Sequence, residues 1–130
     1  MKSITILFSV FFSTASMAQN LVATCVSHEQ KQKTEIFVNS KGLKELFTGV
    51  KSINGHLLLV EEDIVLPTTM RKAKGANIDM PLVNMNSNYL GNWLNFNLNL
   101  GIPTSQKVFV EQSYGGKDYS YEMTCELSEI

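Results

Sequence analysis

The chain has little of several features that mark well-known classes of protein. Of its 130 residues, two are cysteine, three are proline and one is tryptophan. The net charge is −1, without the basic excess or basic stripe of a nucleic-acid-binding protein, so no nucleic acid partner is expected. No run approaches the roughly 20 apolar residues that a membrane-spanning helix needs, so no transmembrane segment is expected.

Motifs of catalysis are also missing. The chain has no GxSxG, HExxH or CxxC motif and no glycine-rich phosphate loop. His28 and His56 are the only histidines that could act as bases near neutral pH, and Ser27 faces away from His28 if both lie on one strand. The carboxylates of residues 61–63 alternate in direction, which makes a poor calcium site. We therefore expect no catalytic residue, no metal site, no cofactor and no enzymatic activity; a hydrolase that uses a histidine is the weakest hypothesis.

What is present begins with an export signal. Lys2 gives a positive start, residues 4–12 form an apolar run, and Ser16 and Ala18 are small residues at the positions that a signal peptidase checks. We expect residues 1–18 to be a signal peptide and residues 19–130 to form a single domain. Soluble export is favoured over lipid attachment at Cys25, since polar residues separate this cysteine from the apolar run. The expected location is the periplasm or the outside of the cell.

The two cysteines, Cys25 and Cys125, lie near the two ends of the exported chain. In an oxidising compartment such a pair most simply forms a disulfide. For a closed loop of about 100 residues, the chain-entropy model gives about 4.7 kcal/mol of stabilisation. Metal ligation and redox chemistry are poorly served by single cysteines without a CxxC partner. We therefore predict a structural disulfide.

Alternation of apolar and polar residues dominates the chain, which is typical of β-strands. It is clearest over residues 90–100, where leucines and a phenylalanine alternate with Trp93 and three asparagines. Residues 119–127 alternate in the same way and include Cys125. Shorter strands are predicted over residues 21–28, 34–39, 56–66 and 107–111.

Turn residues divide these strands. The pair Asn54–Gly55 predicts a type I′ hairpin, and the two glycines within residues 113–118 predict a second hairpin. Residues 41–49 fit a short helix, and residues 44–53 fit a strand equally well. Because residues 67–88 contain two prolines and a glycine and are weakly patterned, we expect one short edge strand and a long loop there.

These features predict an all-β fold. We expect a small antiparallel β-barrel of seven to eight strands closed by one disulfide, with a sandwich as the alternative. The pattern does not decide whether the fold also contains one short helix. The positions of the cysteines favour the barrel, because they place the first and last strands side by side and so remove the sheet edges. Small exported barrels serve as inhibitors, ligand carriers and adhesion modules, so the fold alone does not select a function.

One constellation is unusual and forms our candidate binding face. It consists of Tyr89, Trp93, Asn95, Asn97 and Asn99, which we expect on one side of a strand whose other side is core. Aromatic rings stack on sugars or on partner side chains, and carboxamides both donate and accept hydrogen bonds. Such a face suits a protein or a glycan partner. Its alternative is an exposed surface that the amides only keep soluble.

The sequence therefore favours an exported, non-enzymatic binding module that recognises a protein or glycan partner in the cell envelope, inhibitors included. The alternative is a carrier that holds a small apolar ligand inside the barrel, which requires roughly 300 Å³ of enclosed space. The sequence sets neither the partner's identity nor the oligomeric state.

Overall fold

The structure is a computed structural model that describes residues 20–29, 31–39 and 41–128. The predicted signal peptide, residues 1–18, lies outside the described residues. The described chain forms eight strands and one short 3₁₀ helix. Within these residues, no helix is long and apolar enough to cross a membrane. The elements are β1 (Asn20–Ser27), β2 (Lys33–Val38), η2 (Leu43–Phe47), β3 (Ile53–Leu59), β4 (Ile64–Lys72), β5 (Leu82–Tyr89), β6 (Asn92–Asn99), β7 (Gln106–Tyr114) and β8 (Lys117–Leu127).

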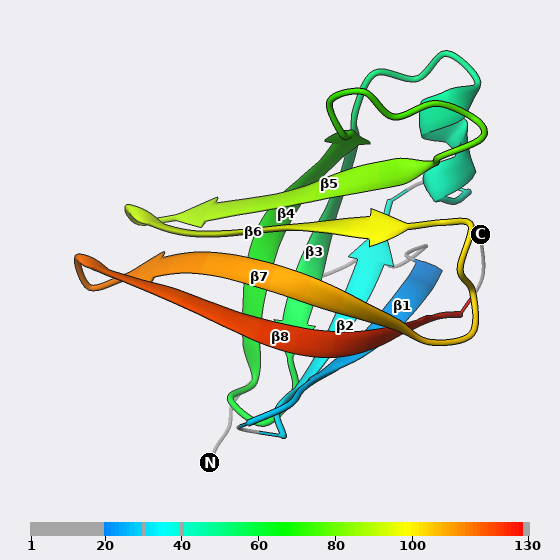
Figure 1. Ribbon diagram of the computed structural model, residues 1–130. Helices are drawn as coiled ribbons and strands as arrows, with labels where there is room; N and C mark the ends of the chain where they lie inside the picture. Colours follow the sequence, from blue (N-terminus) through cyan, green and yellow to red (C-terminus); the bar gives the residue numbers. More distant parts are fainter. Residues whose placement is uncertain (1–19, 30, 40, 129–130) are drawn as a thin grey trace.

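The eight strands form a closed antiparallel barrel in which each strand pairs with the next and β8 returns to β1 (Figure 1). This confirms the predicted all-β barrel over the sandwich. Cys25 and Cys125 lie directly opposite each other in the β1–β8 pair, and the predicted disulfide joins them. Closure gives every strand a hydrogen-bonded neighbour on both sides, so the sheet has no edge strand.

The core follows from strand alternation, because every second side chain of a strand points into the barrel. These inward residues come from all eight strands and form one hydrophobic cluster. Its most deeply buried large members are Ile36, Leu57, Met70, Met85 and Leu98. Complete burial of each such side chain contributes about 1.5–3 kcal/mol to stability.

The two ends of the barrel differ. At the capped end, η2 lies over the barrel between β2 and β3, and its Leu43 and Leu46 are buried in the core. At the open end, the strands are joined by the β1–β2, β3–β4, β5–β6 and β7–β8 turns. The β5–β6 and β7–β8 hairpins project there well beyond the other strands (Figure 1).

Two predictions about residues 54–66 were wrong. Residues 56–66 are not one strand, since β3 ends at Leu59 and a turn ending at Asp63 (φ 53°) leads into β4. Gly55 is not in a hairpin turn either; it lies inside β3, opposite Val38 on β2 and Thr68 on β4. A Cβ at this position would clash with the carbonyl oxygen of Phe37. The glycine is therefore required by a close approach of two strands.

The short edge strand and long loop predicted over residues 67–88 were also wrong, because this segment contains most of β4 and all of β5 except its last residue, Tyr89. Pro67 fits inside β4 because the β4–β5 ladder starts only at Thr68, so its missing N–H leaves no bond unmade on that side. Residues 43–47 form the 3₁₀ helix η2, so the strand alternative for residues 44–53 was wrong and the short helix is confirmed.

The clearest predicted strand, residues 90–100, starts later than expected. Leu90 (φ 53°) and Gly91 (φ 83°) form the β5–β6 turn, and Leu90 is 82% exposed instead of buried. The predicted hairpin within residues 113–118 is confirmed, with Gly115 and Gly116 both at positive φ.

One part of the wall is closed by a side chain. The β6–β7 ladder has three residue pairs, whereas the β7–β8 ladder has nine. Beyond the β6–β7 ladder, the buried amide of Gln106 donates to the carbonyl oxygens of Asn99 (2.7 Å) and Ile102 (3.0 Å). Its Oε1 accepts a hydrogen bond from the backbone N–H of Asn99 (2.9 Å). Gln106 thus supplies the bonds that a neighbouring main chain would otherwise make.

Candidate functional site

The outer surface of β3, β4, β5 and β6 carries a continuous set of uncharged polar side chains, which we call the amide face. Cross-strand pairing places Asn54 beside Thr69, Thr69 beside Asn86, and Asn86 beside Asn95. A second row pairs Asn84 with Asn97. The amide face is completed by Asn88 and Trp93, which pair with each other nearer the open end.

Three of these asparagines hold one another in place. The Nδ2 of Asn84 donates to Oδ1 of Asn97 (2.9 Å) and to Oδ1 of Asn95 (3.1 Å), and the Nδ2 of Asn95 donates back to Oδ1 of Asn84 (3.4 Å). Such a network fixes the direction of each carboxamide. Asn97 of this network is exposed and Asn95 is partly exposed.

Beside this network, the surface is hollowed. The hollow has a volume of about 230 Å³ and is lined by Asn54, Gly55, Pro67, Thr68, Thr69, Asn86 and Asn88. Within the described residues, the amides of Asn86 and Asn88 make no hydrogen bond to another side chain, and both are exposed. Each is therefore free to donate and accept toward a bound molecule.

His56 lies beside Pro67, one of the residues that line the hollow. It pairs with Pro67 across β3 and β4, and its ring stacks on Phe37 at a centroid distance of 4.8 Å. Desolvation by burial lowers the pKa of His56, so the ring is neutral at neutral pH. Among the described outward-facing residues of β3–β6, Arg71 then carries the only charge.

The structure brings together most of the predicted binding face. Trp93, Asn95 and Asn97 share the outer side of β6 as expected. Asn99 shares that side, but its Oδ1 accepts from Gly101 N–H (2.8 Å) and its main chain binds Gln106, so it serves the β6–β7 connection. Tyr89 does not belong to the face. It ends β5 opposite Asn92, and this places it on the inner side.

Sequence reasoning missed the members of the amide face on β3, β4 and β5. Residues 84–88 alternate asparagine with methionine and serine, a period-two signal that the flanking prolines and glycine obscured. Asn54 was missed because the pair Asn54–Gly55 was interpreted as a hairpin turn, whereas both residues lie in β3. The face therefore extends over four strands, β3 to β6, instead of one.

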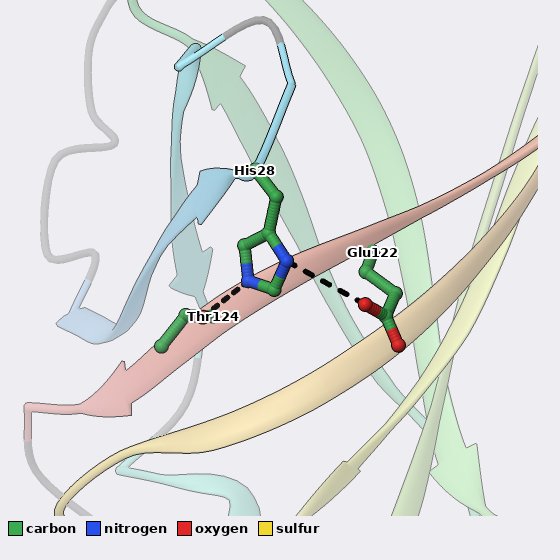
Figure 2. Close-up of polar contacts among 3 residues, drawn as sticks. All are labelled: His28, Glu122 and Thr124. Atoms are coloured by element: carbon green, nitrogen blue, oxygen red, sulfur yellow. Dashed lines mark hydrogen bonds and ion pairs between the residues drawn. The ribbon is translucent and has the colours of Figure 1, made fainter.

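A second cluster lies outside the barrel where the β1–β2 turn meets β8 (Figure 2). The Nε2 of His28 lies 2.5 Å from Oγ1 of Thr124, and its Nδ1 lies 3.5 Å from a carboxylate oxygen of Glu122. The backbone N–H of His28 also donates to the carbonyl oxygen of Glu122 (3.1 Å). An adjacent hollow of about 330 Å³ is lined by Val26, Ser27, His28, Lys31 and Thr124.

The order of hydroxyl, imidazole and carboxylate is that of a hydrolytic triad, but the surroundings do not complete such a site. Acyl transfer needs N–H donors that are aimed at the developing oxyanion. At Thr124 the main chain of β8 is engaged in ladders with Val26 on β1 and Lys107 on β7. The contacts of His28 therefore act as a clamp that fixes the β1–β2 turn to β8.

Neither hollow lies in the barrel core. The inward side chains at mid-height, Met70, Met85 and Phe96 among them, belong to one buried cluster. Within the described residues, no group of three or more histidine, cysteine, aspartate or glutamate side chains is placed to hold a metal ion. The amide face is thus the strongest candidate site.

No protein family model, no curated protein and no solved structure matches this chain. The chain is defined by its fold as a small, disulfide-closed, eight-stranded antiparallel barrel, and its function has to be argued from its surface.

Proposed function

We propose that this chain is an exported, non-enzymatic binding module of the periplasm or the extracellular space, and that its amide face binds an uncharged glycan. The observation that carries the proposal is the pair of free amides, Asn86 and Asn88, in a hollow beside a fixed amide network. The disulfide between Cys25 and Cys125 is compatible with the exported location.

The chemistry of the surface suits sugar hydroxyls. Each hydroxyl donates and accepts, and so does each carboxamide, so one asparagine can bind either way round. A charged ligand would find no opposite charge near the hollow, since His56 is neutral and Arg71 lies in the farther row. Trp93, 38% exposed at the border of the face, offers a ring for stacking.

The test is titration of the protein with cellotetraose, chitotetraose and maltotetraose, with a hyaluronan tetrasaccharide as the charged comparison. Trp93 is the only tryptophan, so its fluorescence reports directly on the face. We expect binding of at least one neutral probe and weaker binding of the charged one.

Variants locate the binding. Loss of one hydrogen bond in Asn86→Ala or Asn88→Ala should weaken binding about twofold to tenfold. Gln32→Ala, which removes an exposed amide from the β1–β2 connection, is the matched control and should bind normally. Failure of all three neutral probes to bind, or equal affinity of the Asn86→Ala, Asn88→Ala and Gln32→Ala variants, would overturn the proposal.

A further inference from the structure

The open end carries a second surface whose chemistry differs from that of the amide face. All four tyrosines of the chain lie in the two projecting hairpins (Figure 1). Strand alternation places them on the inner side of these hairpins, the side that becomes the core deeper in the barrel. We call this surface the tyrosine face; it consists of Tyr89, Tyr114, Tyr119 and Tyr121.

Pairing shows how the tyrosine face emerges from the core. Tyr121 lies opposite the buried Val110 and is itself half-buried. Tyr119 lies opposite Gln112 and is 48% exposed, and Tyr114 near the tip is 62% exposed. The projecting part of the sheet thus has an aromatic inner side with no strand opposite it, and its rings meet solvent.

The two hairpins form one support for these rings. β6 and β7 pair near the tips through Trp93 with Ser113 and Leu94 with Gln112. In addition, the backbone N–H of Gly115 in the β7–β8 turn donates to Oδ1 of Asn92 at the start of β6 (3.1 Å). Tyr89 pairs with Asn92, so the rings of both hairpins are held on a common sheet.

Charge is distributed unequally between the two ends of the barrel. In the turns of the open end and the two strand residues on either side of each turn, five carboxylates accompany three lysines: Glu29, Glu61, Glu62, Asp63 and Asp118, with Lys31, Lys33 and Lys117. In the matching part of the capped end, seven basic side chains accompany three carboxylates: Lys41, Lys44, Lys51, Arg71, Lys72, Lys74 and Lys107, with Glu45, Asp79 and Glu126. The open end is therefore acidic although the chain as a whole is nearly neutral.

The acidic turns lie close enough to the tyrosine face to act on it. Burial raises the pKa of Tyr121, and the negative charge of Glu62 on the β3–β4 turn raises it further. A cation bound at this place would meet tyrosine rings and carboxylates together. Rings attract a guanidinium or ammonium group through their negative faces, and tyrosine is enriched among the residues that dominate protein–protein binding.

We propose that the tyrosine face docks a basic protein, whose arginine or lysine side chains lie against the tyrosine rings and beside the carboxylates of residues 61–63. The occupant is argued from complementarity of charge, because an acidic patch attracts a basic partner and repels an acidic one. The surface is independent of the amide face, which uses the opposite side of β5 and β6.

The test measures the binding of a fluorescein-labelled nona-arginine peptide by fluorescence anisotropy. We expect Tyr119→Ala to weaken binding about threefold, the loss of one exposed cation–π contact. Phe109→Ala is its matched control, because Phe109 is 59% exposed on the outer side of β7. Glu62→Gln should also weaken binding, whereas Asp79→Asn, the same change of charge at the capped end, should not.

Two further arms identify the occupant. Nona-lysine should bind more weakly than nona-arginine, because a guanidinium also stacks on aromatic rings. Spermine should compete poorly; if it binds as tightly as nona-arginine and responds to the same variants, the occupant is a small polycation and the protein proposal is overturned.

The proposal also fails if nona-arginine does not bind, or if the Tyr119→Ala and Glu62→Gln variants bind as well as their controls. The thermal midpoint of each variant confirms that it is folded, and Glu62→Gln changes an exposed turn that contributes nothing to the core. Asn86→Ala should retain full affinity for nona-arginine, so this test and the glycan test have separate outcomes.

Discussion

The two ends of the barrel differ in how their side chains are packed. The capped end has η2 packed on the core through Leu43 and Leu46, and Gln106 closes the wall there from inside. The open end has tight turns, two projecting hairpins and exposed tyrosines. Its interior is also more polar, since Thr68 and Ser87 are buried there and share a hydrogen bond of 2.6 Å.

This difference separates stability from recognition. The buried side chains of the capped end and the disulfide between β1 and β8 stabilise the fold, so changes there should lower the free energy of unfolding. The large side chains of the tyrosine face and the asparagines of the amide face are exposed or only partly buried, so we expect changes there to alter the proposed binding and to leave the fold intact.

The largest effect is expected from loss of the disulfide. The double substitution Cys25→Ser with Cys125→Ser opens a covalent loop with a sequence separation of 100 residues. Removal of such a bridge from a small exported domain costs about 2–5 kcal/mol, mainly by freeing the unfolded chain. Urea unfolding of the variant and of the oxidised protein measures the difference. A change below about 1 kcal/mol would contradict the assignment of the bridge as the main brace.

Truncation in the cap comes next. Leu46→Ala empties a buried position of η2 and should cost about 2–4 kcal/mol, because the transfer free energy is lost and a cavity remains. The matched truncation at the open end, Leu90→Ala, removes a side chain that is 82% exposed and should change stability by less than about 0.5 kcal/mol. Equal thermal shifts for the two variants would remove the contrast between the ends.

A smaller effect is expected from a buried amide. Gln106→Leu removes the partner of the backbone N–H of Asn99 and of the carbonyl oxygen of Ile102, and should cost about 1–3 kcal/mol. Gln112→Leu makes the same change on β7 near the open end, where the glutamine is only partly buried, and should cost little. Denaturant midpoints of the pair decide whether Gln106 acts as described.

The smallest effect concerns pH. Because burial lowers the pKa of His56, the folded protein resists protonation of this ring more than the unfolded chain does. Its contribution to stability is complete above the ordinary histidine pKa of about 6.5 and is lost as the pH falls toward the lowered value. His56→Phe keeps the stacking on Phe37 and should flatten this part of the stability profile. Urea unfolding between pH 7.5 and pH 5 measures this difference. If the stability of the His56→Phe variant depends on pH as strongly as that of the native protein, the assignment is contradicted.

The sequence was sufficient for the architecture where alternation was uninterrupted. The strand around Cys125, the hairpin with Gly115 and Gly116, and the barrel closure through two terminal cysteines all follow from local pattern and chain chemistry. Each depends on neighbours in sequence or on one covalent bond, and these are properties that a single sequence contains.

The errors share a different cause. Gly55 and Pro67 were interpreted as breaks, yet Gly55 permits two strands to approach and Pro67 lies just before the β4–β5 ladder starts. Tyr89 was placed with Trp93 because the turn at Leu90 was counted as strand, and a turn changes which side a residue faces. The members of the amide face on β3, β4 and β5 were missed because only cross-strand register joins Asn54 to Asn95.

The barrel has two seams of unequal kind. One, between β1 and β8, is locked covalently, while the other, between β6 and β7, depends at the capped end on a single carboxamide. A cylinder reinforced on one side bends where it is least reinforced, so fluctuations should concentrate along the second line. The barrel should therefore open locally between the β5–β6 and β7–β8 hairpins. Amide hydrogen exchange should be fastest at the start of β7.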